Sequence, residues 1–303
     1  MRLACIHTHT NFCDGSGDVE TFCRRAHEKG LVSLGFSAHA PITAKTGFPG
    51  SWLMPEERLP EYIETVRAAK KRWEGKLPVY LGLEVDFIPG LIGPADRYYR
   101  ELGLDYTIGS VHFVIPPRGE PFTVDDSYEN VCRGIIEGYG GDPMGMVEAY
   151  YSSLAAMIRA GGFDLLGHPD LVKKNNSDPR ISGEKAAGLK TCGNTLFSED
   201  GKRYREMTAS IAALMAGTGV PAEVNTGGIN RGKIKDCYPS RDFLKLFHER
   251  GVPMVINADA HRPEDLDGHY GEAREAMLRA GYTETLIFGG RGNGRPVWNG
   301  AGL

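Results

Sequence analysis

Seven short apolar runs alternate with longer amphipathic stretches along this chain, and this alternation constrains the fold more than any other feature. The runs cover residues 2–7, 32–37, 78–85, 105–112, 163–168, 220–225 and 252–257. Each run has the length of a buried strand, whereas the stretches between them have helical spacing. Strands that alternate with helices lie parallel and are joined by right-handed crossovers. The sequence therefore predicts an α/β fold, either a barrel or a doubly wound sheet.

Local signals mark two of the helices and several loops. Pro55 opens the predicted helix 55–73, and Ser240 stands at the start of the predicted helix 240–250. Segments rich in Gly, Pro, Asn and Asp are too long to be simple connections, and we expect functional loops there. These segments are 41–54, 116–147 and 173–204.

The glycine-rich end of the chain, residues 290–303, resembles a phosphate-binding loop only superficially. It lacks the G-x-x-x-x-G-K-[ST] pattern and opens no helix. We therefore predict a flexible C-terminal tail attached to a single domain that covers residues 1–303.

Composition excludes several classes of protein. The formal net charge of −4 provides no basic surface for a nucleic-acid backbone, although a small anionic substrate remains compatible. No apolar run is long enough to span a bilayer, and the short N-terminal run meets the polar His7 within seven positions, so we expect neither a membrane span nor a secretion signal. Six cysteines without a C-x-x-C pair suggest reduced thiols, so a cytoplasmic location is expected. The oligomeric state is left open.

Histidines gather at the C-terminal ends of the predicted strands. His7 and His9 follow the first strand, and four other strands are followed by His39, His112, His168 and His261. The third strand ends in Glu84, which we prefer to its neighbour Asp86, and the seventh leads to Asp259. In a barrel these strand ends share one rim, so residues far apart in sequence become neighbours.

These residue types in this arrangement predict a metal centre. His7 and His9 are one residue apart and project to the same face, as do Asp259 and His261. Mixed imidazole and carboxylate ligands suit zinc, manganese or iron, and nine ligands exceed the need of one ion. We therefore expect two or three divalent ions. The predicted ligands are His7, His9, Asp14, His39, Glu84, His112, His168, Asp259 and His261.

The remaining histidines are predicted to be structural. His27 and His248 lie within helical stretches, and His269 lies in a polar loop. Asp14 also has a structural alternative, because Asp-Gly is an ordinary turn dipeptide.

An ordered series of motifs resembles the polymerase and histidinol phosphatase, or PHP, superfamily over nearly the whole chain. The motifs are HTHTNFCDG at 7–15, SAHAP at 37–41, GLEVDF at 82–87, GSVHF at 109–113, GHPDLV at 167–172, EVNTGG at 223–228 and NADAH at 257–261. The resemblance implies a distorted, TIM-like (β/α)7 barrel with three metals. By this analogy the ligand sets are His7, His9, Glu84 and Asp259; Glu84, His112 and His168; and Asp14, His39 and His261.

The resemblance also implies an activity, which is hydrolysis of a phosphate monoester, with L-histidinol phosphate of histidine biosynthesis as the expected substrate. A hydroxide that bridges two cations would attack phosphorus, with Glu84, Asp259 and His261 as catalytic residues. Arg231 is the first candidate to bind the phosphate and Lys173 the second. Lys174, Lys233 and Lys235 are further candidates.

Other points stay open at this level. Asp170, Asp259 or a metal-bound water could protonate the leaving group. The loop 41–54, with Phe48, Trp52 and Met54, could shape the pocket for the rest of the substrate. Rival functions are a phosphoesterase of the same superfamily acting on nucleotides, nucleic-acid ends or sugar phosphates, and a non-enzymatic module that has lost its metals.

Overall fold

The structure is a computed structural model that describes residues 2–42, 48, 50–182 and 188–303. Its centre is a parallel sheet of seven strands in the order β1-β2-β3-β4-β7-β8-β9. The strands are β1 (Ala4–Cys5), β2 (Ser33–Phe36), β3 (Val79–Asp86), β4 (Tyr106–Ser110), β7 (Leu165–Leu166), β8 (Ala222–Asn225) and β9 (Met254–Asn257). Each lies in or overlaps one of the seven predicted runs, which confirms the predicted strand pattern.

The two edges of this sheet meet just beyond the ends of β1 and β9. The amide of His9 donates to the carbonyl of Ala260 over 2.8 Å, and the amide of Ala260 donates to the carbonyl of His7 over 3.1 Å. An isolated parallel bridge joins Thr8 to Ala260. The sheet is thus a nearly closed barrel, which decides between the two architectures that the alternation allowed.

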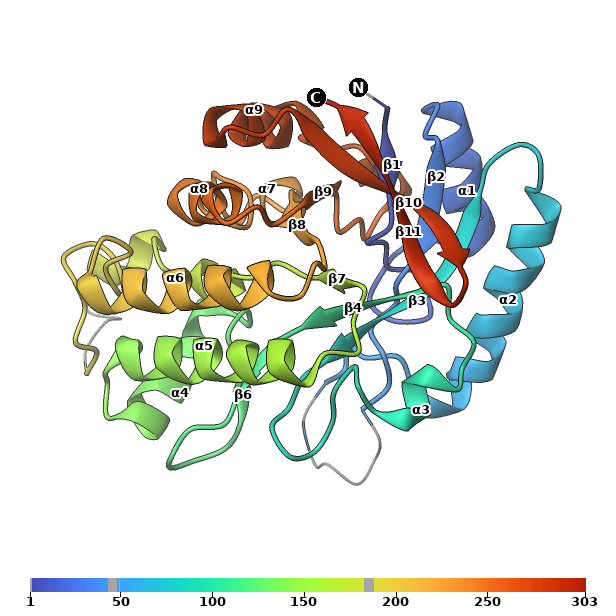
Figure 1. Ribbon diagram of the computed structural model, residues 1–303. Helices are drawn as coiled ribbons and strands as arrows, with labels where there is room; N and C mark the ends of the chain where they lie inside the picture. The colour runs from blue at the N-terminus through green and yellow to red at the C-terminus, as the bar shows by residue number, and fades with distance from the viewer. Residues whose placement is uncertain (1, 43–47, 49, 183–187) are drawn as a thin grey trace.

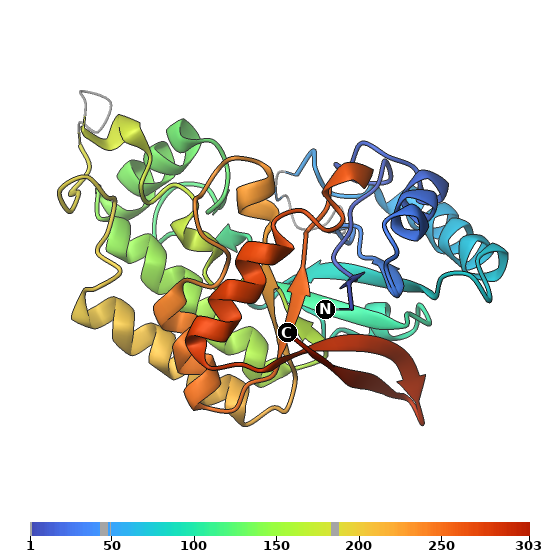
Figure 2. The ribbon, with the colours of Figure 1, turned by 90° about the horizontal axis from the view of Figure 1, so that it is seen from above.

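Helices cover the outside of the barrel (Figures 1 and 2). They are α1 (Val19–Glu28), α2 (Leu59–Arg72), α3 (Arg97–Arg100), α4 (Tyr128–Tyr139), α5 (Pro143–Ala160), α6 (Lys202–Ala216), α7 (Gly227–Asn230), α8 (Arg241–Glu249) and α9 (Tyr270–Ala280). The predicted helices 55–73 and 240–250 correspond to α2 with its preceding turn and to α8. Among the described residues, none of the helices is long and apolar enough to cross a bilayer.

The prediction of a long loop over 116–147 is wrong. This segment contains the short strand β6 (Phe122–Thr123), which pairs with β5 (Phe113–Val114), as well as α4 and the first turn of α5. Its polar residues act as caps, since the hydroxyl of Ser127 accepts from an amide in the first turn of α4. Gly140 ends that helix in the left-handed region, at φ 62°.

The other two predicted loops are partly described. In 173–204 the described residues form turns and short 3-10 helices before α6 begins, as expected, and 183–187 lie outside the described residues. In 41–54, residues 43–47 and 49 likewise lie outside them.

The prediction of a flexible tail over 290–303 is also wrong. Strands β10 (Glu284–Gly292) and β11 (Arg295–Gly302) form an antiparallel hairpin, drawn in red beside the barrel strands in Figures 1 and 2. The hydroxyl of Thr285 donates to the carbonyl of Met254 and accepts from the amide of Ile256, which joins the hairpin to β9. Phe288, with the partly buried Leu286 and Trp298, forms the apolar face that the hairpin turns to the barrel.

The hairpin seals the N-terminal end of the barrel. Phe288 packs in a separate apolar cluster with Ile6, Tyr106, Ile108, Leu165 and Val255. A side chain at Gly35 or Gly82 would come within 2.5 Å or 2.4 Å of Tyr106, so these glycines leave the space that the ring needs. This end of the barrel is therefore a packed core, and the C-terminal rim remains for function.

We predict that Phe288→Ala will lower the free energy of unfolding by about 3–5 kcal/mol, because it removes a buried aromatic ring from the cluster. Val297, on the partner strand, is 39% exposed, and Val297→Ala should change stability by no more than about 0.5 kcal/mol. Urea denaturation of both variants measures the difference. Equal stability losses would contradict the packing of the hairpin against the barrel.

Candidate metal centre

The barrel rim brings all nine predicted ligands together. They form four overlapping groups in which the ligand atoms lie within 4.8 Å of one another. The groups are His9, Asp14, His39 and His261; His7, His9 and Asp259; His7, Glu84 and His168; and His39, Glu84 and His112. None of these groups contains His27, His248 or His269, which are exposed on the helices or in a loop.

Glu84 stands at the centre of the cluster, at the C-terminal end of β3. Its side chain is 1% exposed. One carboxylate oxygen, Oε1, lies 2.9 Å from Nε2 of His168. The other, Oε2, lies 2.9 Å from Nδ1 of His39 and 3.3 Å from Nε2 of His7. A single carboxylate therefore faces imidazoles from several strands, which is the geometry that a bridging ligand requires.

The neighbouring carboxylate, Asp86, has a different task. Its Oδ1 lies 2.9 Å from Nδ1 of His112 and accepts from the amide of the same residue over 3.0 Å. Asp86 thereby orients the ring so that its Nε2 faces Glu84. The groups of neighbouring ligand atoms accordingly contain Glu84 and not Asp86.

Asp259 reaches the cluster through an unusual backbone conformation. Its φ of 48° lies in the left-handed region, which aspartate adopts more readily than most residues. The carboxylate Oδ1 lies 3.2 Å from Nε2 of His9, while Oδ2 accepts from Nη2 of Arg231 over 3.1 Å. The strained turn thus points a carboxylate at both the histidines and a cation.

Asp14 and His261 form the most open part of the rim. Asp14 Oδ2 lies 3.1 Å from Nε2 of His261, and Asp14 is 32% exposed in its side chain. His9 and His39 complete this group from the inner side. Asp14, which the turn dipeptide left ambiguous, therefore lies among the other predicted ligands.

Unpartnered polar atoms show that the cluster fits cations. Among the described residues, several buried ligand atoms have no hydrogen-bond partner. These atoms are His7 Nε2, His9 Nε2, His39 Nδ1, Glu84 Oε2 and His168 Nδ1. Buried polar atoms are normally satisfied, and divalent cations bound by imidazole and carboxylate would satisfy those of His7, His9, His39 and Glu84.

The charges of the cluster are strongly coupled. Burial together with the neighbouring His39 and His261 lowers the pKa of His9 to about 3, so this ring is neutral and has a free lone pair. Burial alone would lower the pKa of His112, but Asp86 and Glu84 outweigh it and raise that pKa to about 10. Burial alone would likewise raise the pKa of Glu84, yet the surrounding histidines hold it well below its usual range.

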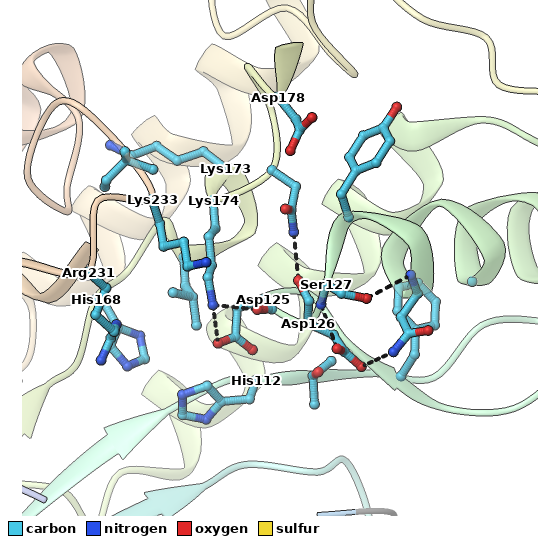
Figure 3. A pocket seen from close by; sticks show the side chains of 18 of the residues that line it. His112, Asp125, Asp126, Ser127, His168, Lys173, Lys174, Asp178, Arg231 and Lys233 are labelled. Atoms are coloured by element: carbon cyan, nitrogen blue, oxygen red, sulfur yellow. Dashed lines mark hydrogen bonds and ion pairs between the residues drawn. The ribbon is translucent and has the colours of Figure 1, made fainter. Parts of the chain in front are cut away.

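A cavity of about 1690 Å³ opens over the rim. Figure 3 shows part of its wall, where Lys174 contacts the carboxylate of Asp125 over 3.1 Å. Arg231 lines the cavity beside the cluster, with Nη1 2.8 Å from Nδ1 of His261. Lys173 also lines it, but its ammonium is already bound to Asp170 at 2.9 Å.

Sequence reasoning missed one carboxylate next to the cluster. Glu223, the second residue of β8, is completely buried, and its two oxygens lie 3.1 and 3.0 Å from Nδ1 of His7. The available signal was a lone carboxylate inside an apolar strand segment, followed by Asn225. Trp52 is better placed than the sequence alone could indicate, because its ring lies 4.5 Å from that of His39 and lines the cavity.

A (β/α)7 barrel with histidines and carboxylates gathered on one rim is the architecture of a metal-dependent hydrolase. The family model described as "PHP domain" matches residues 6–227. The chain belongs to the PHP domain family, and the resemblance seen in its motifs is confirmed.

Two proteins with assigned names align with almost the whole chain. The "Probable histidinol-phosphatase" of Deinococcus radiodurans is 30% identical over 279 residues, covering 91% of this chain and 92% of that protein. The "Histidinol-phosphatase" of Bacillus subtilis is 27% identical over 290 residues, covering 90% of this chain and 97% of that protein.

A solved structure has the same fold. Histidinol phosphate phosphatase from Lactococcus lactis, complexed with zinc, L-histidinol and phosphate, superimposes with a TM-score of 0.68 at 18% identity. The match covers 98% of this chain and 99% of that one.

We predict that zinc binding will release protons and strengthen as pH rises. Burial alone lowers the pKa of His7, but Glu223 and Glu84 outweigh it and raise this pKa well above its ordinary value, as Asp86 and Glu84 do for His112. Both rings therefore carry a proton near neutral pH that a cation must displace. The affinity should rise about tenfold per pH unit for each displaced proton. Chelator competition measures it, and a pH-independent affinity would contradict the prediction.

Proposed function

We propose that this protein hydrolyses L-histidinol phosphate to L-histidinol and phosphate, with two or three divalent ions held at the barrel rim. The observation that carries the proposal is the set of four overlapping ligand groups. The names of the two relatives, each matched over nine tenths of this chain or more, support the choice of substrate.

The number of ions follows from how the groups share residues. Glu84 belongs to two groups, one with His7 and His168 and one with His39 and His112, so it is suited to bridge a pair of ions. The group around Asp14 offers a separate third position. Zinc, manganese and iron all accept such ligands, and zinc is present in the Lactococcus lactis structure.

Bound cations would supply Lewis acidity toward the phosphoryl oxygens and lower the pKa of water. Beside them, Arg231 is placed to bind the phosphate. Its guanidinium is partly exposed to the cavity, and its contacts with Asp259 and His261 fix it at the rim. A planar guanidinium can hold two phosphoryl oxygens at once, which orients phosphorus toward the rim.

Lys173 is a weaker phosphate ligand in this proposal. Its ammonium donates to the carbonyl of Cys237 over 3.0 Å and pairs with Asp170, so these two bonds compete with a substrate. Asp170 is completely buried, and its Oδ2 also accepts from the amide of Ser240 over 2.7 Å. This position, away from the cavity, makes Asp170 a poor proton donor to the leaving group.

The leaving group has an apolar surface to lie against. Trp52 lines the cavity between His39 and His112, with ring centroids 4.5 and 5.2 Å away. A flat imidazole can pack on such an aromatic wall. The six free cysteines fit a reducing compartment, so the proposal includes a cytoplasmic location.

A substrate panel at equal metal loading tests the proposal. Histidinol phosphate, nucleoside monophosphates, sugar phosphates and nucleic-acid ends are compared by kcat/KM with zinc or manganese. Histidinol phosphate should be preferred. Preference for a nucleotide would overturn the substrate, while absence of both transition metal and phosphatase activity would overturn the enzyme.

His9→Ala and Glu84→Ala should each lower kcat by about a thousandfold or more, because cation binding supplies several kcal/mol of transition-state stabilisation. His248→Ala is the control, since His248 is exposed on α8 and contacts Tyr282 rather than the cluster. Steady-state kinetics at saturating metal measures all three. Comparable losses in the three variants would show that strand-end placement does not mark the active residues.

Arg231→Ala should lower kcat/KM by about 10- to 100-fold at saturating metal, because it removes charge-assisted hydrogen bonds to phosphate. Lys235→Ala, on the outer cavity wall, should change it only a few-fold. Inorganic phosphate should also inhibit the Arg231 variant less strongly than the wild type. An unchanged inhibition constant would exclude Arg231 as the phosphate ligand.

A further inference from the structure

Glu223 is a completely buried carboxylate with nitrogen atoms around both of its oxygens. Its Oε1 accepts from the amide of His168 over 2.9 Å and from Nδ2 of Asn225 over 2.7 Å. Its Oε2 accepts from Nδ2 of Asn257 over 3.0 Å. Nδ1 of His7 lies against both oxygens. Four nitrogen atoms, from residues at or just beyond the ends of β1, β7, β8 and β9, thus converge on one buried carboxylate.

The orientation of the two asparagine amides is determined by the backbone. Oδ1 of Asn225 accepts from the amide of Gly227 over 2.8 Å, and Oδ1 of Asn257 accepts from the amide of Ile6 over 3.0 Å. Backbone amides can only donate, so each side-chain oxygen must face its amide. The Nδ2 groups therefore face Glu223, and both must donate to it.

This arrangement determines the hydrogen on His7. The amide of His168 and the two asparagine Nδ2 groups all donate to Glu223. Its side chain must therefore act as an acceptor, as an ionised carboxylate does. Nδ1 of His7 consequently carries its hydrogen and donates to Glu223. When a cation displaces the second proton of this ring, the lone pair is on Nε2, which lies 3.3 Å from Oε2 of Glu84 and 3.7 Å from Oδ1 of Asp259.

We infer that Glu223 is the positioning residue of the metal centre, which holds the ring of His7 in the orientation and tautomer that present Nε2 to a cation. The inference rests on the metal centre of the proposed function. Glu223 also holds the amide of His168, so one carboxylate sets the position of two predicted ligands from β1 and β7. A carboxylate that accepts from the far nitrogen of a ligating histidine also increases the basicity of the near one.

The test measures zinc affinity rather than turnover. Glu223→Gln keeps the shape of the side chain but places an amide NH2 among donors and removes the charge. Its affinity for zinc, measured by chelator competition on metal-free protein, should fall about 10- to 100-fold. In this variant the site around His7 should bind cobalt more weakly than the other positions. At stoichiometric cobalt its visible absorption should therefore be weaker than that of the wild type.

Asp164→Asn is the matched control. Asp164 lies at the opposite end of the barrel, where its Oδ2 accepts from the amide of Thr107 over 3.0 Å and from Nη2 of Arg291 over 2.6 Å. It therefore changes a similar hydrogen-bonded carboxylate far from the rim. Its zinc affinity and cobalt spectrum should match the wild type, even if its melting temperature falls as far as that of Glu223→Gln.

A double variant separates positioning from folding. In Glu223→Gln combined with Asn257→Asp, the new carboxylate at 257 can accept from the Gln amide while still accepting from the amide of Ile6. The melting temperature of the metal-free protein should recover, whereas zinc affinity should stay low. Recovery of both together would show that Glu223 only stabilises the fold, and would overturn the inference.

The outcomes also distinguish this inference from the proposed function. If the wild type binds no zinc, cobalt or manganese, the metal centre itself is wrong. If the wild type binds zinc tightly and Glu223→Gln binds it equally well, only the role of Glu223 is wrong. A selective loss of zinc affinity in Glu223→Gln, with Asp164→Asn unchanged, is the expected result.

Discussion

Closure of the barrel between β1 and β9 is the constraint on which the rest of the structure depends. Two short hydrogen bonds through Ala260 join the ends of these strands directly beside His7 and Asp259. Parallel strands in a closed ring direct their C-terminal ends to one rim, so side chains from all parts of the chain meet there. The same backbone bonds that close the sheet therefore bring the predicted metal ligands together.

The rim concentrates charge where the rest of the barrel is apolar. Glu84 is buried and faces several imidazoles, and burying such groups without compensation is costly. Two sets of partners offset this cost. Divalent cations can satisfy the unpartnered inner atoms, while Asp86 and Glu223 bind the outer nitrogens of His112 and His7. The outer carboxylates thus contribute to the site without lying in it.

The two ends of the barrel have opposite roles. At the N-terminal end, Phe288 from the hairpin and Tyr106 from β4 fill the interior. At the C-terminal end, the long connections after the strands leave a wide cavity that Arg231 and Trp52 line. A packed lower half gives the rim a rigid base, and rigid support is what ligand geometry within tenths of an ångström requires.

The sequence by itself determined the strands and placed the nine residues at their C-terminal ends, because strand periodicity and strand-end position are local properties of the chain. The barrel followed only from the resemblance of its motifs and from the closure of β1 onto β9. It did not reveal which ligand atoms share a position: His7 groups with Glu84 and His168, and His39 with Glu84 and His112. It also concealed Glu223, the helix α4 behind a loop-like composition, and the hairpin behind its glycines. Only the tertiary structure decided these, because they depend on side-chain directions and contacts that exist after the strands have closed into a ring.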